Sequence, residues 1–193
     1  MVSVNDAVGA LAISVLLAPG PRWPPAAPVS FWIQKENARE RHRELVRCAL
    51  AVWGDAIGGA LRFEESELPP ARGIRVVFTP ELVHFGFTKP EVDGQGRIRR
   101  ADVIVATDPV GDALQKELIV YLTALHELGH ALGLGHSDRI GEIMYRFRHP
   151  MDPDRVFLAY RRKLRSAEDI GGPEATGLSE ADRRAIRALY PGP

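Results

Sequence analysis

The chain has 193 residues, enough for one ordinary domain and too few for two. Hydrophobic residues make up 45% and charged residues 26%, a balance typical of globular proteins rather than disordered or fibrous ones. The 25 basic and 25 acidic residues cancel, so the overall charge suggests no nucleic-acid or anionic-membrane partner. Cys48 is the single cysteine, which excludes a disulfide framework, and its apolar helical surroundings predict a buried thiol.

Residues 1–28 are expected to precede the folded domain. An apolar run at 8–18 has the length of an export signal, but its flank carries Asp6 and no basic residue, whereas export signals have a basic flank. The run is too short to span a bilayer. Five prolines within 19–28 favour a linker or an extended lead-in. Two alternatives stay open for this stretch: a signal or its remnant, and an N-terminal extension that is packed or loosely ordered.

Residues 29–193 are expected to form one domain of helices and strands. Apolar residues recur at helical spacing in 38–57, and Gly58 with Gly59 can end that helix. The segment 74–79 is rich in β-branched residues and bounded by glycine and proline, which favours a strand. Shorter extended pieces are predicted at 29–33, 61–64 and 82–88.

A turn, a strand and a long helix follow. Asp93 begins a D-G-Q-G sequence that predicts a hairpin turn, with a calcium ligand as the alternative role for its carboxylate. Residues 98–107 predict a strand. Asp112 can cap the next helix, along which leucines between 114 and 132 form an apolar stripe at helical spacing. That stripe would anchor the helix firmly enough to hold a site of defined geometry.

Residues 126–136, HELGHALGLGH, have the form H-E-x-x-H-x-x-G-x-x-H. On a helix, His126 and His130 lie on one face and can hold a single zinc ion together. Gly133 can end the helix by adopting a left-handed conformation, after which His136 can return as a third ligand. Three protein ligands leave a fourth position open, which is the arrangement of a catalytic zinc. The alternative interpretation is three histidines that bind no metal, and that interpretation would not require this spacing.

Glu127 adds the group that hydrolysis requires. Its carboxylate can take a proton from a water on the zinc and pass it to a leaving amine, while the metal polarises the carbonyl. The predicted reaction is hydrolysis of an acyl bond, and a peptide bond is the natural substrate. Ser137 has no base beside it in the sequence, so we predict a role in the turn. The other histidines, His42, His84 and His149, show no spacing for a second metal site.

The sequence gives weaker signals of secondary structure after this motif. Met144, taken alone, predicts only core packing. Prolines and glycines interrupt residues 146–177. Ser179 is a good N-cap, and Asp182 three residues later imitates a capping box at the start of a closing helix. The helices predicted in this part of the chain are 156–165 and 180–190.

The motif at 126–136, followed by Met144, resembles the metzincin superfamily of zinc endopeptidases. Ser137 directly after the third histidine is similar to the matrixin branch, the matrix-metalloproteinase-like peptidases of family M10A. Residues 48–53 resemble the first helix of matrixins, and residues 61–63 resemble the strand after it. Residues 178–190 resemble their closing helix. The resemblance therefore runs from about residue 29 to 190.

This resemblance implies an α+β fold, with a twisted mixed five-stranded sheet, two long helices and a C-terminal helix. It assigns the ligands of one catalytic zinc to His126, His130 and His136. It assigns the general base to Glu127, and structural support of the site to Gly133, Ser137 and Met144. The implied partner is a protein or peptide bound in extended form along an edge strand. We expect a monomer, with no nucleic-acid partner and no transmembrane segment.

Several features are closer to minimal microbial peptidases of this type than to the animal enzymes. The sequence has no cysteine-switch segment and no recognisable structural-zinc segment, so a second zinc or a calcium ion has no support. Arg146 stands where a proline is usual, and 146–177 is longer than usual beside the specificity pocket. The sequence therefore does not predict substrate preference. We expect a secreted enzyme, with a cytoplasmic one as the alternative. A catalytically weak or inactive zinc-binding module of the same fold is the other alternative, and the presence of Glu127 argues against it.

Overall fold

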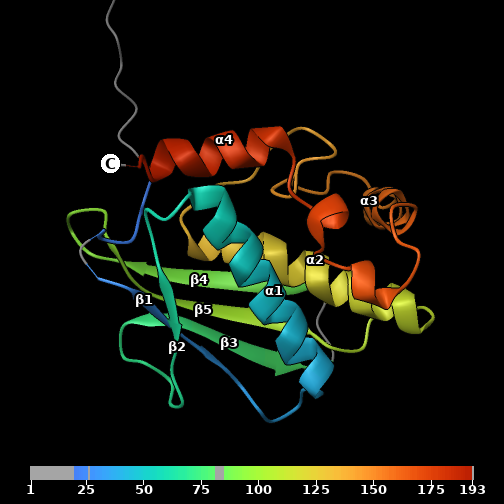
Figure 1. Cartoon of the computed structure of the whole chain (residues 1–193), viewed down its shortest axis with the longest axis horizontal. Coiled ribbons are helices and arrows are strands. Elements are labelled where there is room, and N and C mark those ends of the chain that lie inside the picture. The colour runs from blue at the N-terminus through green and yellow to red at the C-terminus, as the bar shows by residue number, and fades with distance from the viewer. Residues whose placement is uncertain (1–19, 26, 81–84, 193) are drawn as a thin grey trace, which may run out of the picture.

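The computed structural model describes residues 20–25, 27–80 and 85–192. Five strands form one sheet in the order β2-β1-β3-β5-β4 (Figure 1). Neighbours among β1, β2, β3 and β5 run parallel, and β4 pairs antiparallel with β5 at one edge. The strands are β1 (Val29–Ile33), β2 (Phe63–Glu65), β3 (Gly73–Thr79), β4 (Gly86–Val92) and β5 (Ile98–Ala106). The predicted α+β class with a mixed five-stranded sheet is confirmed.

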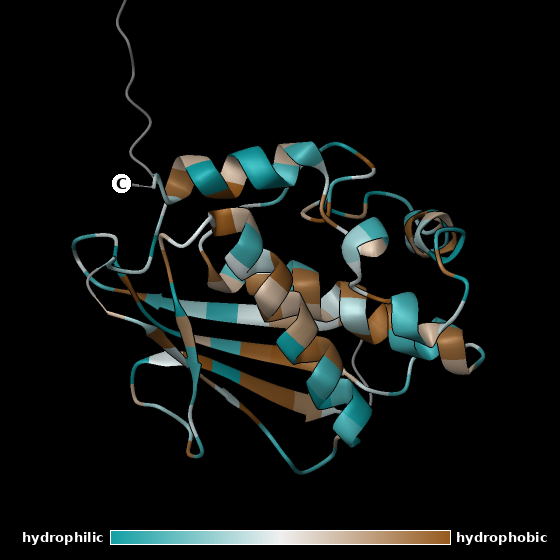
Figure 2. Ribbon diagram, viewed as in Figure 1, coloured by the Kyte–Doolittle hydropathy of each residue, from teal (hydrophilic) through white to brown (hydrophobic). Residues whose placement is uncertain are grey.

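Two long helices, α1 (Glu40–Ile57) and α2 (Ala113–Ala131), cover one face of the sheet (Figure 1). Figure 2 shows hydrophobic residues concentrated along α1, β3 and β5, where the layers meet. The buried indole of Trp53 joins the helices by donating to the carbonyl oxygen of Leu125 at 2.9 Å. The described part of the chain contains no helix of sufficient length and apolar character to cross a membrane.

The ends of both long helices agree with the sequence. Helix α1 begins two residues later than predicted and ends at Gly58, whose φ of 70° is the left-handed conformation that glycine adopts at low cost. Helix α2 begins after Asp112, whose side chain accepts a hydrogen bond from the backbone N–H of Gln115 at 2.8 Å. Cys48, on α1, is half-buried rather than fully buried.

The C-terminal third has more regular structure than predicted. A helix expected at 156–165 lies instead at α3 (Asp152–Arg161). Pro153 occupies the first turn of this helix. Backbone N–H groups there have no partner within the helix, so a proline, which has no N–H, can start the helix rather than break it. Two short 3-10 turns follow, η1 (Ala167–Asp169) and η2 (Pro173–Ala175). The closing helix, α4 (Glu180–Leu189), has the predicted capping box between Ser179 and Asp182.

The edge strand also differs from the prediction. Of the extended piece expected at 82–88, residues 82–84 lie outside the described residues, and β4 continues to Val92. Pro90 is tolerated inside it because an edge strand needs no hydrogen bond on its outer side. The hairpin turn predicted at Asp93 is present, since Oδ1 of that residue accepts from the backbone N–H of Gln95 at 2.9 Å and of Arg97 at 3.1 Å.

Part of the proline-rich stretch contacts the domain. The backbone of Arg22 bridges to Arg97, and the buried Trp23 donates its indole N–H to the carbonyl of Ala131 at 2.9 Å. This bond satisfies one of the carbonyls left free at the C-terminal end of α2. The apolar run at 8–18 lies outside the described residues. The domain boundary near residue 29 stays a prediction.

Candidate metal centre and cleft

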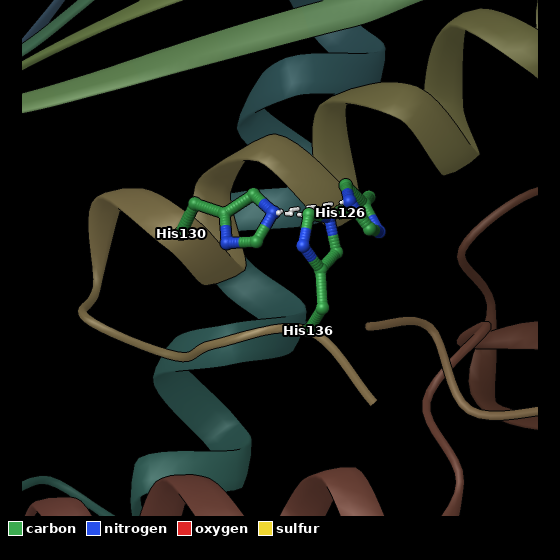
Figure 3. A group of neighbouring side chains, drawn as sticks. All are labelled: His126, His130 and His136. Carbon is green, nitrogen blue, oxygen red and sulfur yellow. Dashed lines mark hydrogen bonds between the residues drawn. The ribbon is translucent and has the colours of Figure 1, made fainter. Parts of the chain in front are cut away.

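Three histidine side chains converge at the C-terminal end of α2. His126 and His130 project from adjacent turns of the helix, and His136 returns from the following loop (Figure 3). The Nε2 atom of His130 lies 3.1 Å from Nε2 of His126 and 3.2 Å from Nε2 of His136. Tetrahedral ligands about 2.0–2.1 Å from a zinc ion would be separated by roughly 3.3 Å. The three nitrogens are therefore spaced closely enough to bind one metal ion.

Backbone carbonyls fix the tautomers of two of these rings. Nδ1 of His126 lies 2.6 Å from the carbonyl oxygen of Ile143, and Nδ1 of His130 lies 2.8 Å from that of Leu134. Because a carbonyl can only accept, both Nδ1 atoms carry the proton and both Nε2 atoms present a lone pair. The short contact between these Nε2 atoms thus brings two acceptors together. A cation between them would remove the resulting repulsion.

The electrostatic surroundings keep the rings neutral. Burial lowers the pKa of His126 to about 4. It also lowers the pKa of His130 and, together with the charge of Arg146, that of His136. A neutral imidazole is the form that binds a metal. All three side chains are therefore prepared to act as ligands near neutral pH.

Glu127 lies beside the histidines with only 7% of its surface exposed. Burial raises the pKa of its carboxyl group to about 7, against the opposing effect of a hydrogen bond from Thr88. That hydroxyl lies 2.7 Å from Oε2 of the carboxylate. Gly86 makes the close packing possible, because a Cβ atom there would lie 2.7 Å from Cγ of Glu127. A carboxyl group with a pKa near neutrality is suited to both accepting and releasing a proton.

Gly133 allows the turn between the second and third histidines, as predicted. Its φ of 97° lies in the left-handed region, and a Cβ atom there would lie 1.8 Å from the carbonyl oxygen of Pro21. The residue therefore provides both the helix exit and the space for the N-terminal segment. Ser137 accepts a backbone hydrogen bond from Arg146 at 2.9 Å and donates its own N–H to Met144 at 2.7 Å. The loop that carries the third histidine is thereby tied to the chain around residue 145.

Met144 is buried directly beneath α2, where a Cβ atom added to Gly129 would lie 2.3 Å from its sulfur. Gly129 lies between the first two histidines of the motif on the same helix. Met144 therefore packs against the helix segment that carries them. Its predicted role as structural support of the site stays a prediction.

The histidines open into a cleft of about 1170 Å³. One side is the edge strand β4, represented by Phe87 and Thr88, and the other includes residues 145–150. Between them is an apolar wall in which the ring of Phe157 meets Phe85 edge-on at 5.1 Å and Phe147 at 6.2 Å. The cleft thus has space and apolar surface for a polypeptide segment.

The two other histidines that the structure describes do not join the group. His149 lines the cleft, whereas His42 is buried in α1 beside Phe78. His84 lies outside the described residues. Within the described ranges, the one group of three potential ligands close enough to share a metal is His126, His130 and His136.

Sequence reasoning missed several residues that position this site. Thr88 contacts Glu127 from a strand, and nothing in its neighbouring sequence indicates that. Asp152 is buried and accepts from the hydroxyl of Tyr145 and from two backbone N–H groups of the cleft loop. Asp182 was identified only as a capping residue, although its burial and its bond to Ile143 give it a second function.

Comparison with known proteins agrees with this geometry. The chain matches the family model Peptidase_M10, described as Matrixin, over residues 22–161. A comparison with curated proteins finds no significant match. The matched region covers well over half of the chain and includes the whole histidine motif, the edge strand and α3. The chain therefore belongs to the matrixin family and contains a metallopeptidase-like domain.

Proposed function

We propose that this protein is a zinc-dependent endopeptidase that hydrolyses peptide bonds in extended protein segments. The observation that carries the proposal is the convergence of three histidine Nε2 atoms beside a buried carboxylate in an open cleft. Membership of the matrixin family supports it. The proposed roles are metal ligands for His126, His130 and His136 and general base for Glu127.

The donor set fits zinc. Three neutral imidazoles are typical zinc ligands, and three protein ligands leave a position for a further small ligand or substrate oxygen. The two Nδ1–H groups held by backbone carbonyls would keep the rings oriented for one ion. When bound, zinc would polarise the scissile carbonyl and lower the pKa of a water molecule. We propose one zinc ion per chain.

The chain's own residues would move the proton. The carboxylate of Glu127 would take a proton from the attacking water as its oxygen bonds to the carbonyl carbon. The same group would give that proton to the departing amine nitrogen as the C–N bond breaks. Its pKa of about 7 suits both steps. No covalent bond between protein and substrate is required.

The substrate would lie along β4. Among the described residues, this strand is at the edge of the sheet, so its outer backbone groups would pair with an extended peptide. The apolar wall containing Phe85, Phe147 and Phe157 lies within the same cleft and would receive a side chain of that peptide.

A peptide-library digest tests activity and metal dependence together. We expect cleavage by the zinc-loaded protein, loss of cleavage on adding a chelator, and recovery on adding zinc back. Mass spectrometry of the products would give the side-chain preference. If the protein binds one zinc ion but cleaves no peptide or unfolded protein, the alternative of a zinc-binding module without turnover would replace this proposal.

A further inference from the structure

The hydroxyl of Thr88 bridges the edge strand to the carboxylate beside the histidines. Its Oγ1 lies 2.7 Å from Oε2 of Glu127 and 2.9 Å from the main-chain oxygen of the same residue. Both distances are within hydrogen-bond range, and because a hydroxyl has a single hydrogen, the two oxygens share one donor, with Oε2 the nearer acceptor. Within the described part of the chain, Oε1 of Glu127 has no hydrogen-bond partner, and the residue lines the cleft. The two carboxylate oxygens therefore have different surroundings.

The pairing of β4 shows where the backbone around Thr88 points. Phe85 accepts a backbone hydrogen bond from Ala106 of β5, and the antiparallel register continues with Phe87 opposite Ile104. Backbone groups alternate in such a ladder, so those of residues 85 and 87 point toward β5. The N–H and C=O groups of Gly86 and Thr88 therefore point away from the sheet, to the side on which a peptide would pair.

Side chains alternate along the same strand. Residues 86 and 88 face α2, where Gly86 closely approaches the side chain of Glu127 and Thr88 bonds to it. Phe87 between them faces the other way and is 54% exposed. The two residues whose backbone would pair with substrate are thus the two that contact the carboxylate.

We propose that Thr88 is a positioning residue, whose hydroxyl holds Oε2 of Glu127 and leaves Oε1 directed at the reacting water. This inference rests on the proposed function. The bond also connects the carboxylate to the strand edge at which the peptide backbone would bind. The distance between the base and the scissile bond is therefore set by one short contact rather than by the flexible side chain of a glutamate.

The different surroundings of the two carboxylate oxygens also determine which of them accepts the proton. An oxygen that already accepts a hydrogen bond from a hydroxyl is a weaker proton acceptor than one that does not. Oε1 would consequently be the oxygen that takes the proton from water. The hydroxyl of Thr88 would remain a donor to Oε2 throughout the reaction.

The variants Thr88→Val and Thr88→Ser separate the hydroxyl from the shape of the side chain. Valine keeps the volume and β-branching but removes the donor, whereas serine keeps the donor. We expect Thr88→Val to lower kcat by about 10- to 100-fold, because a small misplacement of a catalytic group has effects of that size. KM should stay within about threefold, since the side chain does not contact substrate. Thr88→Ser should retain most of kcat, and zinc content should be unchanged in both.

Thr107→Val is a matched control. The Thr107 hydroxyl also donates to a main-chain carbonyl, that of Thr79 at 3.2 Å, but the residue does not line the cleft. The same isosteric change there should leave kcat and KM unchanged. The Thr107→Val variant shows how far the loss of one hydrogen bond between a hydroxyl and the backbone affects the fold, without any effect on the cleft.

Crystal structures of the two Thr88 variants give a readout that does not depend on turnover. We expect the Glu127 side chain to leave its position in Thr88→Val and to keep it in Thr88→Ser. The inference would be overturned if Thr88→Val retained both kcat and the carboxylate position, or if Thr88→Ser lost activity to the same extent as Thr88→Val. Failure of the zinc-loaded wild-type protein to cleave any peptide would contradict the proposed function, whereas the crystallographic comparison would still test the positioning of Glu127.

Discussion

Asp182 in the closing helix accepts a hydrogen bond from the backbone N–H of Ile143 at 3.0 Å. The carbonyl oxygen of Ile143 lies 2.6 Å from Nδ1 of His126. Ile143 thus connects α4 to His126, the first histidine of the motif, through its backbone N–H and C=O groups. The orientation of that ring depends on a helix that begins more than fifty residues later in the chain.

Asp182→Ala should therefore affect both stability and metal binding. Oδ2 of Asp182 also accepts from the N–H and the hydroxyl of Ser179, and the side chain is only 2% exposed. Removing it leaves the N–H of Ile143 buried without an acceptor and removes the capping box. We expect a loss of about 2–4 kcal/mol in the free energy of unfolding, measured by urea denaturation. Zinc affinity should fall about tenfold or more.

Ser179→Ala is the control for that prediction. It removes the capping hydroxyl but leaves the bond between Asp182 and Ile143 in place. We expect a loss of about 1 kcal/mol in unfolding free energy and no change in zinc affinity. Equal zinc affinities for the Asp182→Ala and wild-type proteins would show that the connection to His126 does not matter.

The convergence of the three histidines could be predicted from the sequence because its geometry is local. His126 and His130 are separated by one helical turn, and Gly133 with its positive φ allows His136 to return within six residues of His130. Such relationships follow from helix periodicity and from the backbone preferences of glycine. The two long helices and the side-chain caps of α2 and α4 were predicted for the same reason, whereas the mixed five-stranded sheet was implied by the resemblance to matrixins.

The supporting contacts could not be predicted, since they depend on how distant segments pack. Thr88 and Glu127 are 39 residues apart, and Asp182 and Ile143 are also 39 apart. Pairing at that separation is set by the register of β4 and the docking of α4, neither of which leaves a periodic signal. Pro153 shows the opposite problem, because a proline that starts a helix has the same sequence appearance as one that ends it.

Glu127→Ala should reduce cleavage by orders of magnitude without removing the metal. The residue is proposed as a base and not as a ligand, so zinc content after dialysis should equal that of the wild-type protein. General bases contribute typically 10²- to 10⁴-fold, and we expect kcat/KM to fall by about that factor. Glu127→Gln is the closer control, since it keeps an oxygen for the Thr88 hydroxyl but cannot accept the proton. Cleavage by either variant at the wild-type rate would rule out this mechanism.

His136→Ala should weaken zinc binding markedly. His136 is the most exposed of the three, and it is held by a loop rather than by α2. Two imidazoles would remain, so we expect zinc to be lost on dialysis against a weak chelator. The rise in Tm that zinc gives the wild-type protein should shrink accordingly, because the stabilisation by a bound ligand grows with the logarithm of the ratio of its concentration to its Kd.

His149→Ala is the matched change for a histidine that lines the same cleft but lies outside the converging group. It should leave both zinc content and the zinc-dependent rise in Tm unchanged. Loss of zinc from His149→Ala together with retention by His136→Ala would reassign the third ligand.

Gly133→Ala should destabilise the protein, and Gly135→Ala, two residues later in the same loop, should not. At Gly133 the backbone is left-handed, and the added Cβ would lie 1.8 Å from the carbonyl oxygen of Pro21. At Gly135 the added Cβ would meet no atom within 4 Å. We expect a loss of about 1–3 kcal/mol in unfolding free energy for the first variant and less than about 0.5 kcal/mol for the second. Because the clash is with Pro21, deletion of residues 1–21 in the Gly133→Ala background should recover part of the loss. Equal stabilities for the two alanine variants would mean that the N-terminal segment does not press against this turn in solution.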